Sequence, residues 1–420
     1  MSRKINSELK TLNSEPPSGW RWMKLGEVCK INPSRPRSFY RSPNAPTSFV
    51  PMVAVDEKTG TISKPEIVPY SKVAKGYTYF EENDVLFAKI TPRMQNGKHV
   101  IARNLIDGIG FGTTEFHVLR PNEEVLPEWV HFYIRQPSFL QEATGYFTGA
   151  VGQQRVPEEF LANYIIPLPT KEEQEHIAAK IQELMHEVEH ARTACEKQLE
   201  AAKALPAAYL REVFESEEAK KWERKRLGEV LSANPQYGLT ATAVDIVKDY
   251  IYLRITDITE EGKIKGQDLK YIESDKKTFE KYKVSAGDIL IARSGSVGRV
   301  YLVKESDLPR PAVFASYLIR FRLKPDYVLP EYFFYFALSE QYKSFISEQI
   351  KTVAQPNINA KQYQILEIPL PPIETQQRIA IDLKEKLAQV EKLQSAISNQ
   401  KSALDALPQA ILRKAFRGEL

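Results

Sequence analysis

The chain of 420 residues is long for a single hydrophobic core, and its 42% apolar and 27% charged residues exclude a largely disordered protein. The net charge of +4 is compatible with a polyanionic partner but is too small to establish one. Its two cysteines have no partner spacing that would indicate a disulfide framework or a zinc site, and neither a signal peptide nor a run of about 18 apolar residues occurs, so we expect a cytoplasmic protein without a membrane span.

A tail over residues 1–19 is expected to precede a globular domain at 20–166. This region is rich in Pro, Gly, Tyr and Phe, and its short apolar or alternating runs at 84–88 and 114–120 predict strands. The aromatic, amphipathic stretch at 127–140 predicts one helix. The expected fold class of this domain is therefore α+β.

A helical segment is predicted next, over residues 167–216. The joint Ile166-Pro167-Leu168-Pro169 is expected to end the preceding strand and to start the helix. Apolar residues then alternate in steps of four and three, with one polar exception at Gln198, which predicts a coiled-coil seam. The expected seam residues are Ile177, Ile181, Leu184, Val188, Ala191, Cys195, Ala202 and Leu205.

The second half of the chain repeats the first at a constant offset, such as that between Trp20 and Trp222. The Leu-Gly-Glu-Val element at 25–28 recurs at 227–230, and the Ile-Pro-Leu-Pro joint recurs at 368–371. Two like units in tandem predict a pseudo-two-fold molecule. The Trp and Leu-Gly-Glu-Val elements are expected to pack each domain against the helices.

The repeat predicts a second globular domain at 217–368, with strands at 288–292 and 317–322 and one helix at 330–346. A second helical segment is predicted at 369–420. Its expected seam residues are Ile379, Leu383, Lys386, Val390, Leu393, Ile397, Gln400, Leu404 and Leu407.

Chain topology predicts the arrangement of these parts. The first helix leads from one domain to the other and the second leads back, so we expect two pseudo-symmetric α/β globular domains separated by two long antiparallel coiled-coil helices. About 34 helical residues at 1.5 Å each correspond to roughly 50 Å. If Ala191 lies opposite Leu393, then Leu184 faces Gln400 and Gln198 faces Lys386, a polar layer that would fix the register.

The tandem of globular domain, Ile-Pro-Leu-Pro joint followed by Gln174 or Gln376, long helix and Leu-Pro break resembles the DNA-specificity subunit of type I restriction-modification systems. The resemblance covers residues 20–418. Residues 84–98 and 110–121 resemble one subgroup of target-recognition domains, and residues 288–298 are similar to the glycine-rich segment of another. Because the two domains differ, we expect them to recognise different half-sites.

The resemblance implies a non-catalytic subunit that binds double-stranded DNA with a bipartite target, one half for each target-recognition domain. It also implies that the helices dock two methyltransferase subunits and that restriction/translocase subunits join the complex. No cofactor is expected on this chain. S-adenosylmethionine belongs to the methyltransferase partner, and ATP and Mg to the restriction partner.

Loops that follow the central strands carry the candidate DNA-binding residues. Recognition of bases and phosphates requires Arg, Lys, Asn, Gln and hydroxyl side chains, and Gly295 and Gly298 allow a close approach of the backbone to phosphate. The alternative is that these loops are ordinary solvent-exposed surface that binds no DNA. The candidates are Lys89, Thr91, Arg93, Gln95, Asn96, Lys98 and Arg155 in the first domain and Arg293, Ser294, Ser296, Arg299 and Lys351 in the second.

Two rival functions stay open at this point. His186-Glu187-Val188-Glu189-His190 matches the H-E-x-x-H pattern of zinc metallopeptidases. Against this alternative, Val188 is a seam residue, so both histidines are expected to face solvent, and their counterparts in the repeat are Ala388 and Lys392. The other alternative is a coiled-coil scaffold without DNA binding.

Motifs for further chemistry are absent from the sequence. It contains no Gly-x-x-x-x-Gly-Lys-Ser/Thr loop, so the chain is not expected to hydrolyse ATP. Asn32-Pro33-Ser34 and Asn234-Pro235-Gln236 lack the second proline and the aromatic residue of the adenine methyltransferase motif. Methyl transfer is therefore expected from a partner.

Overall fold

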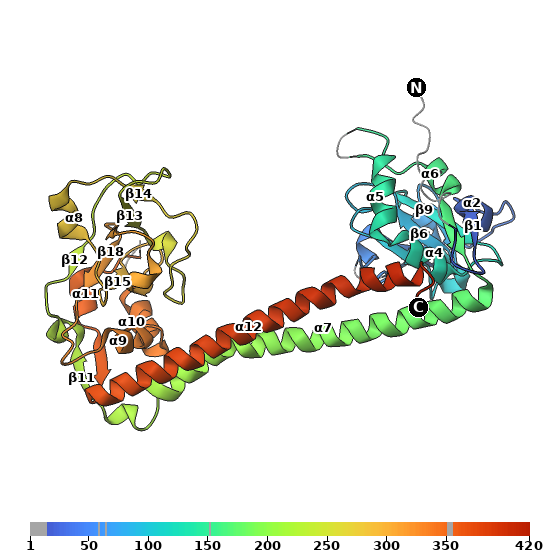
Figure 1. The fold of residues 1–420 in the computed structure, drawn as a ribbon. Coiled ribbons are helices and arrows are strands. Elements are labelled where there is room, and N and C mark those ends of the chain that lie inside the picture. Colours follow the sequence, from blue (N-terminus) through green and yellow to red (C-terminus); the bar gives the residue numbers. More distant parts are fainter. Residues whose placement is uncertain (1–14, 58, 64, 151–152, 351–355) are drawn as a thin grey trace. The chain divides into compact units, whose positions relative to one another are not determined.

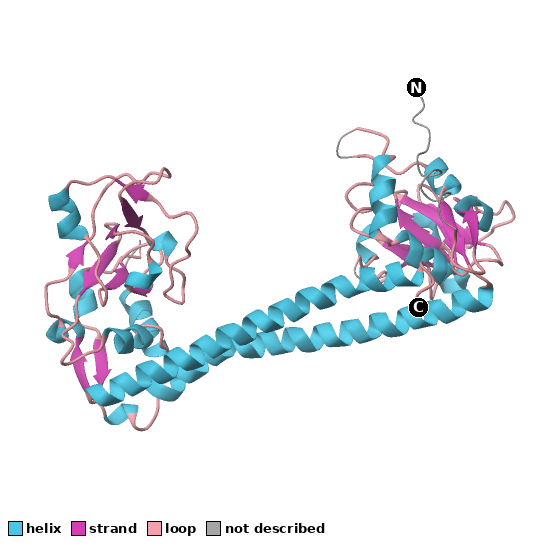
Figure 2. Cartoon of the chain, viewed as in Figure 1, coloured by secondary structure: helices cyan, strands magenta, loops and turns pink. Residues whose placement is uncertain are grey.

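The computed structural model describes residues 15–57, 59–63, 65–150, 153–350 and 356–420. The chain divides into two compact units, Met1–Cys195 with Gln400–Leu420 and Glu196–Asn399. Each unit combines one globular domain with a part of each of two long helices, α7 (Lys171–Phe214) and α12 (Ile373–Ala415) (Figure 1). Both domains mix short strands with helices (Figure 2), which confirms the α+β prediction.

The first domain contains, in chain order, β1 (Arg21–Lys24), α2 (Leu25–Val28), β2 (Cys29–Ile31), β3 (Pro46–Val50), η1 (Met52–Ala54), β4 (Glu66–Pro69), α3 (Tyr70–Val73), β5 (Thr78–Glu81), β6 (Val85–Ala88), β7 (His99–Ile101), η2 (Ile106–Gly108), β8 (Ile109–Gly112), β9 (Phe116–Pro121), α4 (Pro127–Ile134), α5 (Pro137–Gly145), α6 (Glu158–Asn163) and β10 (Ile165–Leu168). The strand orders are β2-β9-β6-β7, β4-β3-β8-β5 and β1-β10. The strands predicted at 84–88 and 114–120 are thus β6 and β9.

The sheet that contains β6 and β9 is covered on both faces. Phe87 and Leu119 enter the larger core of the unit, whereas Leu86 and Val118 enter a second core against the other sheet. A strand with two covered faces needs consecutive apolar residues, which explains the unbroken Val-Leu-Phe-Ala run of β6. The larger core continues into the long helices through Ile177, Ile181, Ile411, Leu412, Ala415 and Phe416.

The second domain contains η3 (Ala219–Lys221), β11 (Glu223–Arg226), η4 (Leu227–Val230), β12 (Gln236–Tyr237), β13 (Tyr250–Leu253), η5 (Ile255–Asp257), β14 (Tyr271–Ile272), α8 (Lys276–Tyr282), β15 (Ile289–Ala292), β16 (Val300–Leu302), η6 (Glu305–Asp307), β17 (Ala312–Phe314), β18 (Leu318–Phe321), α9 (Pro330–Phe336), α10 (Glu340–Ile350), α11 (Ala360–Gln364) and β19 (Glu367–Leu370). Its strand orders are β12-β18-β15-β16, β14-β13-β17 and β11-β19. Ala292 pairs with Leu318 as Ala88 pairs with Phe116, so β15 and β18 correspond to β6 and β9.

The helices predicted at 127–140 and 330–346 are each divided in two, which corrects the expectation of one helix per domain. In the first domain, Gln136 is extended (φ −67°, ψ 137°) because it precedes Pro137, and α5 starts there anew. In the second domain no proline intervenes. There the amide of Ser339 bonds to the carbonyl of Phe336 (3.0 Å), a tighter turn that ends α9 before α10 begins.

The Ile-Pro-Leu-Pro joints end a strand and precede a helix, as predicted, and their first three residues are part of that strand. β10 ends at Leu168 and β19 at Leu370, and α7 and α12 each begin three residues later. β10 pairs antiparallel with β1 and places Pro167 opposite Trp22, and β19 pairs with β11 in the same way. A two-stranded sheet has two edges, and proline is tolerated where its missing N–H faces no partner. The carbonyl of Pro167 accepts a hydrogen bond from Nε1 of Trp129 (2.9 Å), and that of Pro369 accepts one from the hydroxyl of Tyr332 (2.7 Å).

Trp20 and the buried amides of Gln174 and Gln376 attach the domains to the helices. Trp20 Nε1 donates to the carboxylate of Glu173 on α7 (2.8 Å), as expected for a packing residue. Gln174 accepts from the amide of Leu126 (2.8 Å) and donates to the carbonyls of Glu124 (2.9 Å) and Pro169 (3.1 Å). Gln376 makes the equivalent bonds with Leu329 (3.0 Å), Tyr327 (2.9 Å) and Pro371 (3.0 Å).

The Leu-Pro motifs do not break the helices, because α7 continues through Pro206 and α12 through Pro408. Proline has no N–H to donate to the carbonyl four residues earlier. For Pro206 that carbonyl belongs to Ala202, and it accepts a hydrogen bond from Nε2 of Gln394 on α12 instead (3.0 Å). None of the helices in the described residues combines the length and apolar character that a membrane crossing demands.

The predicted seam has two apolar positions in each heptad, and the structure agrees with the prediction at one of them. Ile181, Cys195 and Ala202 of α7 and Leu383, Val390 and Ile397 of α12 are buried as expected. The other position lies one residue later than predicted, since Leu393 is 45% exposed and Gln394 is half-buried. Polar residues such as Arg192 and Lys401 also occupy this later position and are half-buried, and a count of apolar residues misses them.

The predicted register of Ala191 opposite Leu393 is wrong. In the unit Glu196–Asn399, Gln394 contacts Ala202 and the ammonium of Lys386 lies 5.2 Å from the ring centroid of Tyr209. The residue number on α12 falls as that on α7 rises, so the two segments are antiparallel there. The residue that follows Leu393 thus contacts Ala202, which comes 11 residues after Ala191 on α7.

Candidate nucleic-acid interface

The candidate segment of the first domain starts directly after β6 and is held by backbone hydrogen bonds on two sides. The amide of Lys89 donates to the carbonyl of Glu115 (2.9 Å), which precedes β9. The carbonyl of Lys89 accepts from the amide of Val156 (2.9 Å), in the loop before α6. Lys89 is thus fixed between two other loops, one of which contains the candidate Arg155.

The rest of this segment is a compact turn with polar side chains. The amide of Met94 donates to the carbonyl of Ile90 (2.9 Å), and the amide of Asn96 donates to that of Pro92 (3.0 Å). Gly97 closes the turn at φ 76°, a conformation that glycine adopts without steric cost. The predicted residues Arg93, Gln95 and Asn96 are exposed, and Thr91 is half-buried.

Lys98 lies apart from this exposed surface. Its ammonium donates to the carbonyl of Val55 (2.7 Å) and lies 3.8 Å from the carboxylate of Glu57. Its side chain is only 10% exposed. The ammonium of Lys98 is thus bound within the domain, and this geometry gives no support to its predicted DNA contact.

Lys89, Glu115 and Arg155 form a charged group at the base of the turn. Arg155 donates to the carboxylate of Glu115 through Nε (2.9 Å) and Nη2 (2.7 Å). This pairing lowers the pKa of Glu115 and raises that of Arg155. Partial burial lowers the pKa of Lys89. Arg155 keeps 40% of its side chain exposed, so it is still accessible to a ligand.

A cavity of about 410 Å³ opens beside Lys89 and is lined by basic and aromatic side chains, among them Arg35 and Tyr77. Arg35 donates to the hydroxyl of Tyr70 (2.9 Å). Tyr40, five residues further on, is 88% exposed. No candidate was predicted in this loop, although three arginines and two aromatic residues occur together from Arg35 to Arg41, and side chains of these kinds contact nucleic acids.

The second domain holds its candidate segment in the same frame. The amide of Arg293 donates to the carbonyl of Tyr317 (2.9 Å), and its carbonyl accepts from the amide of Ile358 (2.9 Å). The guanidinium of Arg293 lies 4.8 Å from the ring centroid of Tyr237, and its Nε donates to Oδ1 of Asn357 (3.4 Å). Ser294 is half-buried and Ser296 is exposed.

The two remaining candidates of the second domain are Arg299 and Lys351. Arg299 donates from Nη1 to the carbonyls of Ile255 (3.4 Å) and Ile258 (2.8 Å), and its side chain is 17% exposed. It therefore supports the loop around η5, and this geometry gives no support to its predicted DNA contact. Lys351 lies outside the described residues.

Three further residues lie at these segments and were not among the predicted candidates: Glu115, Tyr237 and Tyr317. Glu115 and Tyr317 occupy equivalent places before β9 and β18, and Tyr237 packs against a candidate arginine. The constant offset of the repeat pairs Glu115 with Tyr317 and Arg155 with Asn357, so aligning the two halves around the candidate loops would have identified them.

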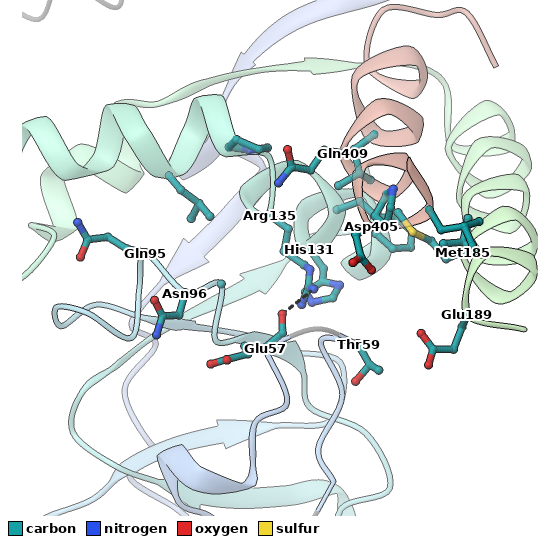
Figure 3. A pocket seen from close by; sticks show the side chains of 18 of the residues that line it. Glu57, Thr59, Gln95, Asn96, His131, Arg135, Met185, Glu189, Asp405 and Gln409 are labelled. Atoms are coloured by element: carbon teal, nitrogen blue, oxygen red, sulfur yellow. Dashed lines mark hydrogen bonds between the residues drawn. The ribbon is translucent and has the colours of Figure 1, made fainter. Parts of the chain in front are cut away.

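A larger cavity of about 740 Å³ lies between the turn of the first domain and the helices of the same unit (Figure 3). Gln95 and Asn96 lie on one side and Met185, Glu189, Asp405 and Gln409 on the other, with His131 and Arg135 of α4 between them. Nη2 of Arg135 donates to the carbonyl of Glu57 (3.0 Å). His131 bonds to the carbonyl of His99 (3.0 Å), and burial lowers its pKa to about 3.

The H-E-x-x-H pattern lies on α7 with both histidines exposed. The ring centroids of His186 and His190 are 4.3 Å apart. Over the described ranges, no group of three or more His, Cys, Asp or Glu side chains is placed to hold a metal ion. The geometry gives no support to the metallopeptidase alternative, because a zinc site of that kind needs a third protein ligand.

Sequence comparison gives two matches to the family described as type I restriction modification DNA specificity domain, over residues 17–200 and 219–403. The chain is similar to the specificity subunit of the type I restriction enzyme EcoEI of Escherichia coli, with 32% identity over 272 residues. It is also similar to that of EcoAI of the same species, with 38% identity over 172 residues. These matches cover 62% and 41% of this chain but only 44% and 29% of the two relatives.

Two solved structures resemble the whole chain. One concerns complex assembly and conformational transition of the type I R-M system, with a TM-score of 0.75 and 25% identity, and the match covers 97% of this chain and 100% of the other. The second is the HsdS subunit from Thermoanaerobacter tengcongensis, with a TM-score of 0.70, 25% identity and coverage of 97% and 99%.

Proposed function

The chain belongs to the type I restriction modification DNA specificity family, and we propose that it is the specificity subunit of a type I restriction-modification complex. Each globular domain recognises one half of a bipartite DNA target. The chain acts in the cytoplasm and is not itself an enzyme. Methyl transfer and DNA cleavage belong to the partner subunits, which carry S-adenosylmethionine and ATP with Mg respectively.

One observation carries this proposal. Both domains hold a polar segment after the central strand by the same backbone bonds, from Lys89 to Glu115 and from Arg293 to Tyr317. The exposed side chains on this common frame differ between the domains. A shared frame with different polar side chains is what recognition of two unlike half-sites requires, because base edges differ in their donors and acceptors. It also favours DNA recognition over the alternative of a scaffold that binds no DNA.

The helices serve as the docking sites for two methyltransferase subunits. Glu172 and Glu175 near the start of α7 are exposed, as are Arg378, Lys384 and Glu385 on α12. These polar faces lie outside the seam, so a partner can bind them without separating the two helices. The domain boundaries that we propose are those of the repeat, at 20–166, 167–216, 217–368 and 369–420.

The test is to express the chain together with a cognate methyltransferase subunit and to map methylated adenines across the host genome. We expect a split motif with two unlike halves and a constant gap. A contiguous motif would contradict the proposal. Binding of the chain to duplex DNA that weakens steeply as salt increases is expected as well, and salt-independent or absent binding would favour the scaffold alternative.

A further inference from the structure

Three backbone positions correspond one to one between the candidate interfaces. The first follows the central strand and is Lys89 or Arg293. The second precedes the neighbouring strand and is Glu115 or Tyr317, as the pairing of Ala88 with Phe116 and of Ala292 with Leu318 requires. The third lies in the returning loop and is Arg155 or Asn357, which form bridges to Ile90 and Ser294 respectively.

The frame around these positions is nearly identical in the two domains. The bond from the first position to the carbonyl of the second is 2.9 Å in both. The residue after the third position is Val156 or Ile358. Its amide donates to the carbonyl of the first position over 2.9 Å in both domains. A difference in side chains therefore changes the chemistry presented to DNA while the backbone stays the same.

In the first domain, positions two and three carry an ion pair. Glu115 and Arg155 are joined by two hydrogen bonds, and their side chains are 24% and 40% exposed. Nη1 of Arg155 also donates to the carbonyl of Gln153 (3.0 Å), so three of its five N–H groups are engaged and two are left to donate next to the carboxylate acceptors. In the major groove a G·C pair presents two acceptors, N7 and O6 of guanine, next to one donor, N4 of cytosine. The two patterns are complementary.

In the second domain, the same positions carry an aromatic ring and an amide. Tyr317 is 62% exposed, and Asn357 is exposed, with its Oδ1 in only a long contact (3.4 Å) with Arg293. An A·T pair presents N7 and N6 of adenine, which match the acceptor and donors of asparagine, and the thymine methyl group, which packs on apolar surface. This domain has no carboxylate at position two to accept from cytosine.

We infer that positions two and three are specificity-determining in both domains, with Glu115 and Arg155 recognising a G·C pair and Tyr317 and Asn357 recognising an A·T pair. The inference rests on the proposed function and assigns a base pair to each matched couple. Lys89 and Arg293 at position one lie between the other two positions and contact the adjoining phosphates.

The test exchanges the couples and maps the methylated motif. In the chain with Glu115→Tyr and Arg155→Asn, one position of the half-site bound by the first domain should change from G·C to A·T, while the other half stays as it was. The reciprocal variant, Tyr317→Glu with Asn357→Arg, should change only the half-site of the second domain. Preference for the original pair should fall about tenfold or more, as expected for loss of one bidentate base contact.

Arg103 and Glu128 offer a matched control in the first domain. They form an ion pair with 45% and 21% exposed side chains, away from the three positions. Glu128→Tyr with Arg103→Asn should leave the motif unchanged. Arg155→Lys is a second test variant, which keeps the charge but lacks the planar fork, and it should relax the same position. It keeps the inference testable if an exchanged chain does not fold.

The outcomes separate this inference from the proposed function. If the unaltered chain gives a split motif but exchanged, folded chains give the same motif, the inference is wrong and the proposed function stands. An exchange that alters both halves, or a control that alters the motif as the exchange does, also overturns the inference. If the unaltered chain directs no split motif, the proposed function fails first.

Discussion

The two globular domains share the bonds that hold their fold and differ in the side chains that face outward. Asp84 accepts two hydrogen bonds from Arg120 (2.8 and 2.7 Å), and Asp288 occupies the same place and accepts from Arg322 (2.7 and 3.4 Å). Trp129 and Tyr332 donate to equivalent proline carbonyls. The two domains therefore have their internal polar contacts in common, while the side chains of the loops beside these contacts differ.

The largest effect is expected from the buried carboxylates. The side chain of Asp84 is 1% exposed, and Asp84→Ala removes the buried acceptor of two hydrogen bonds from Arg120 and of one from the amide of Glu81. We expect a loss of about 3–5 kcal/mol of stability, as for removal of one member of a buried pair. Asp288→Ala should have a similar cost in the second domain. Hydrogen exchange followed by mass spectrometry should show that each variant lowers the protection of backbone amides only in its own domain. Lower protection in both domains would contradict the view that the two buried carboxylates act separately.

The glutamines that attach the domains to the helices should have equal effects. Gln174 and Gln376 are fully buried, and each forms three hydrogen bonds with the backbone. Replacement by alanine leaves buried partners unsatisfied, at about 1–3 kcal/mol for each variant. Denaturant unfolding of both variants measures this cost. A large cost for one variant and none for the other would show that the two attachments are not equivalent.

Acidification should distinguish the two domains. Burial lowers the pKa of His99, His117 and His131, the last to about 3, and residues 217–368 contain no histidine. Below about pH 6.5 the unfolded chain binds protons that the folded first domain excludes, so stability is complete above that pH and falls below it. For His131 the loss at pH 5 is about 2 kcal/mol.

This pH effect can be measured as hydrogen exchange of the two domains at pH 7 and pH 5, after correction for intrinsic exchange rates. The backbone amides of the first domain should be less protected at pH 5 than at pH 7. The second domain has no histidine, so its amides should show no loss from this cause. The variant His131→Gln should respond less to pH than the unaltered chain. Equal responses of both domains would contradict the assignment to the buried histidines.

The smallest effect is expected at the turn of the first domain. Arg93 is exposed, whereas the ammonium of Lys98 is bound to the carbonyl of Val55. If Arg93 contacts a phosphate, Arg93→Ala should reduce the slope of log affinity against log salt by about one. Lys98→Ala should leave this slope unchanged and lower stability instead. Fluorescence anisotropy with duplex DNA at several salt concentrations tests both, and the reverse pattern would restore Lys98 as a contact.

The sequence predicted the elements that depend on local pattern. The apolar runs of β6 and β15 and the long helices follow from periodicity alone, and the repeat predicted two domains of like fold. It did not predict that Pro206 is accommodated within α7, because that depends on Gln394, a residue far away in the sequence. The same reason explains the misplaced seam position and register. The position of the seam and the register of the two helices depend on contacts between the helices, and the spacing of apolar residues does not indicate these contacts.

The candidate site was predicted in part for a similar reason. Loop composition identified Arg93, Gln95 and Asn96, which are exposed. It did not predict that Lys98 and Arg299 bond to backbone carbonyls within their domains, because composition does not tell in which direction a side chain points. Glu115 and Tyr317 carry no positive charge, so the basic character of the loops does not indicate them. Their equivalent places become visible only in the structures of the two domains.

The central claim is that each domain independently determines one half of the target. Its most direct test is a chain in which residues 20–166 are replaced by a second copy of residues 222–368, joined at the Ile-Pro-Leu-Pro strand. Coexpressed with the methyltransferase, this chain should direct methylation to a split target with two copies of the second half-site. An unchanged motif, or one in which the second half-site is also altered, would contradict the claim.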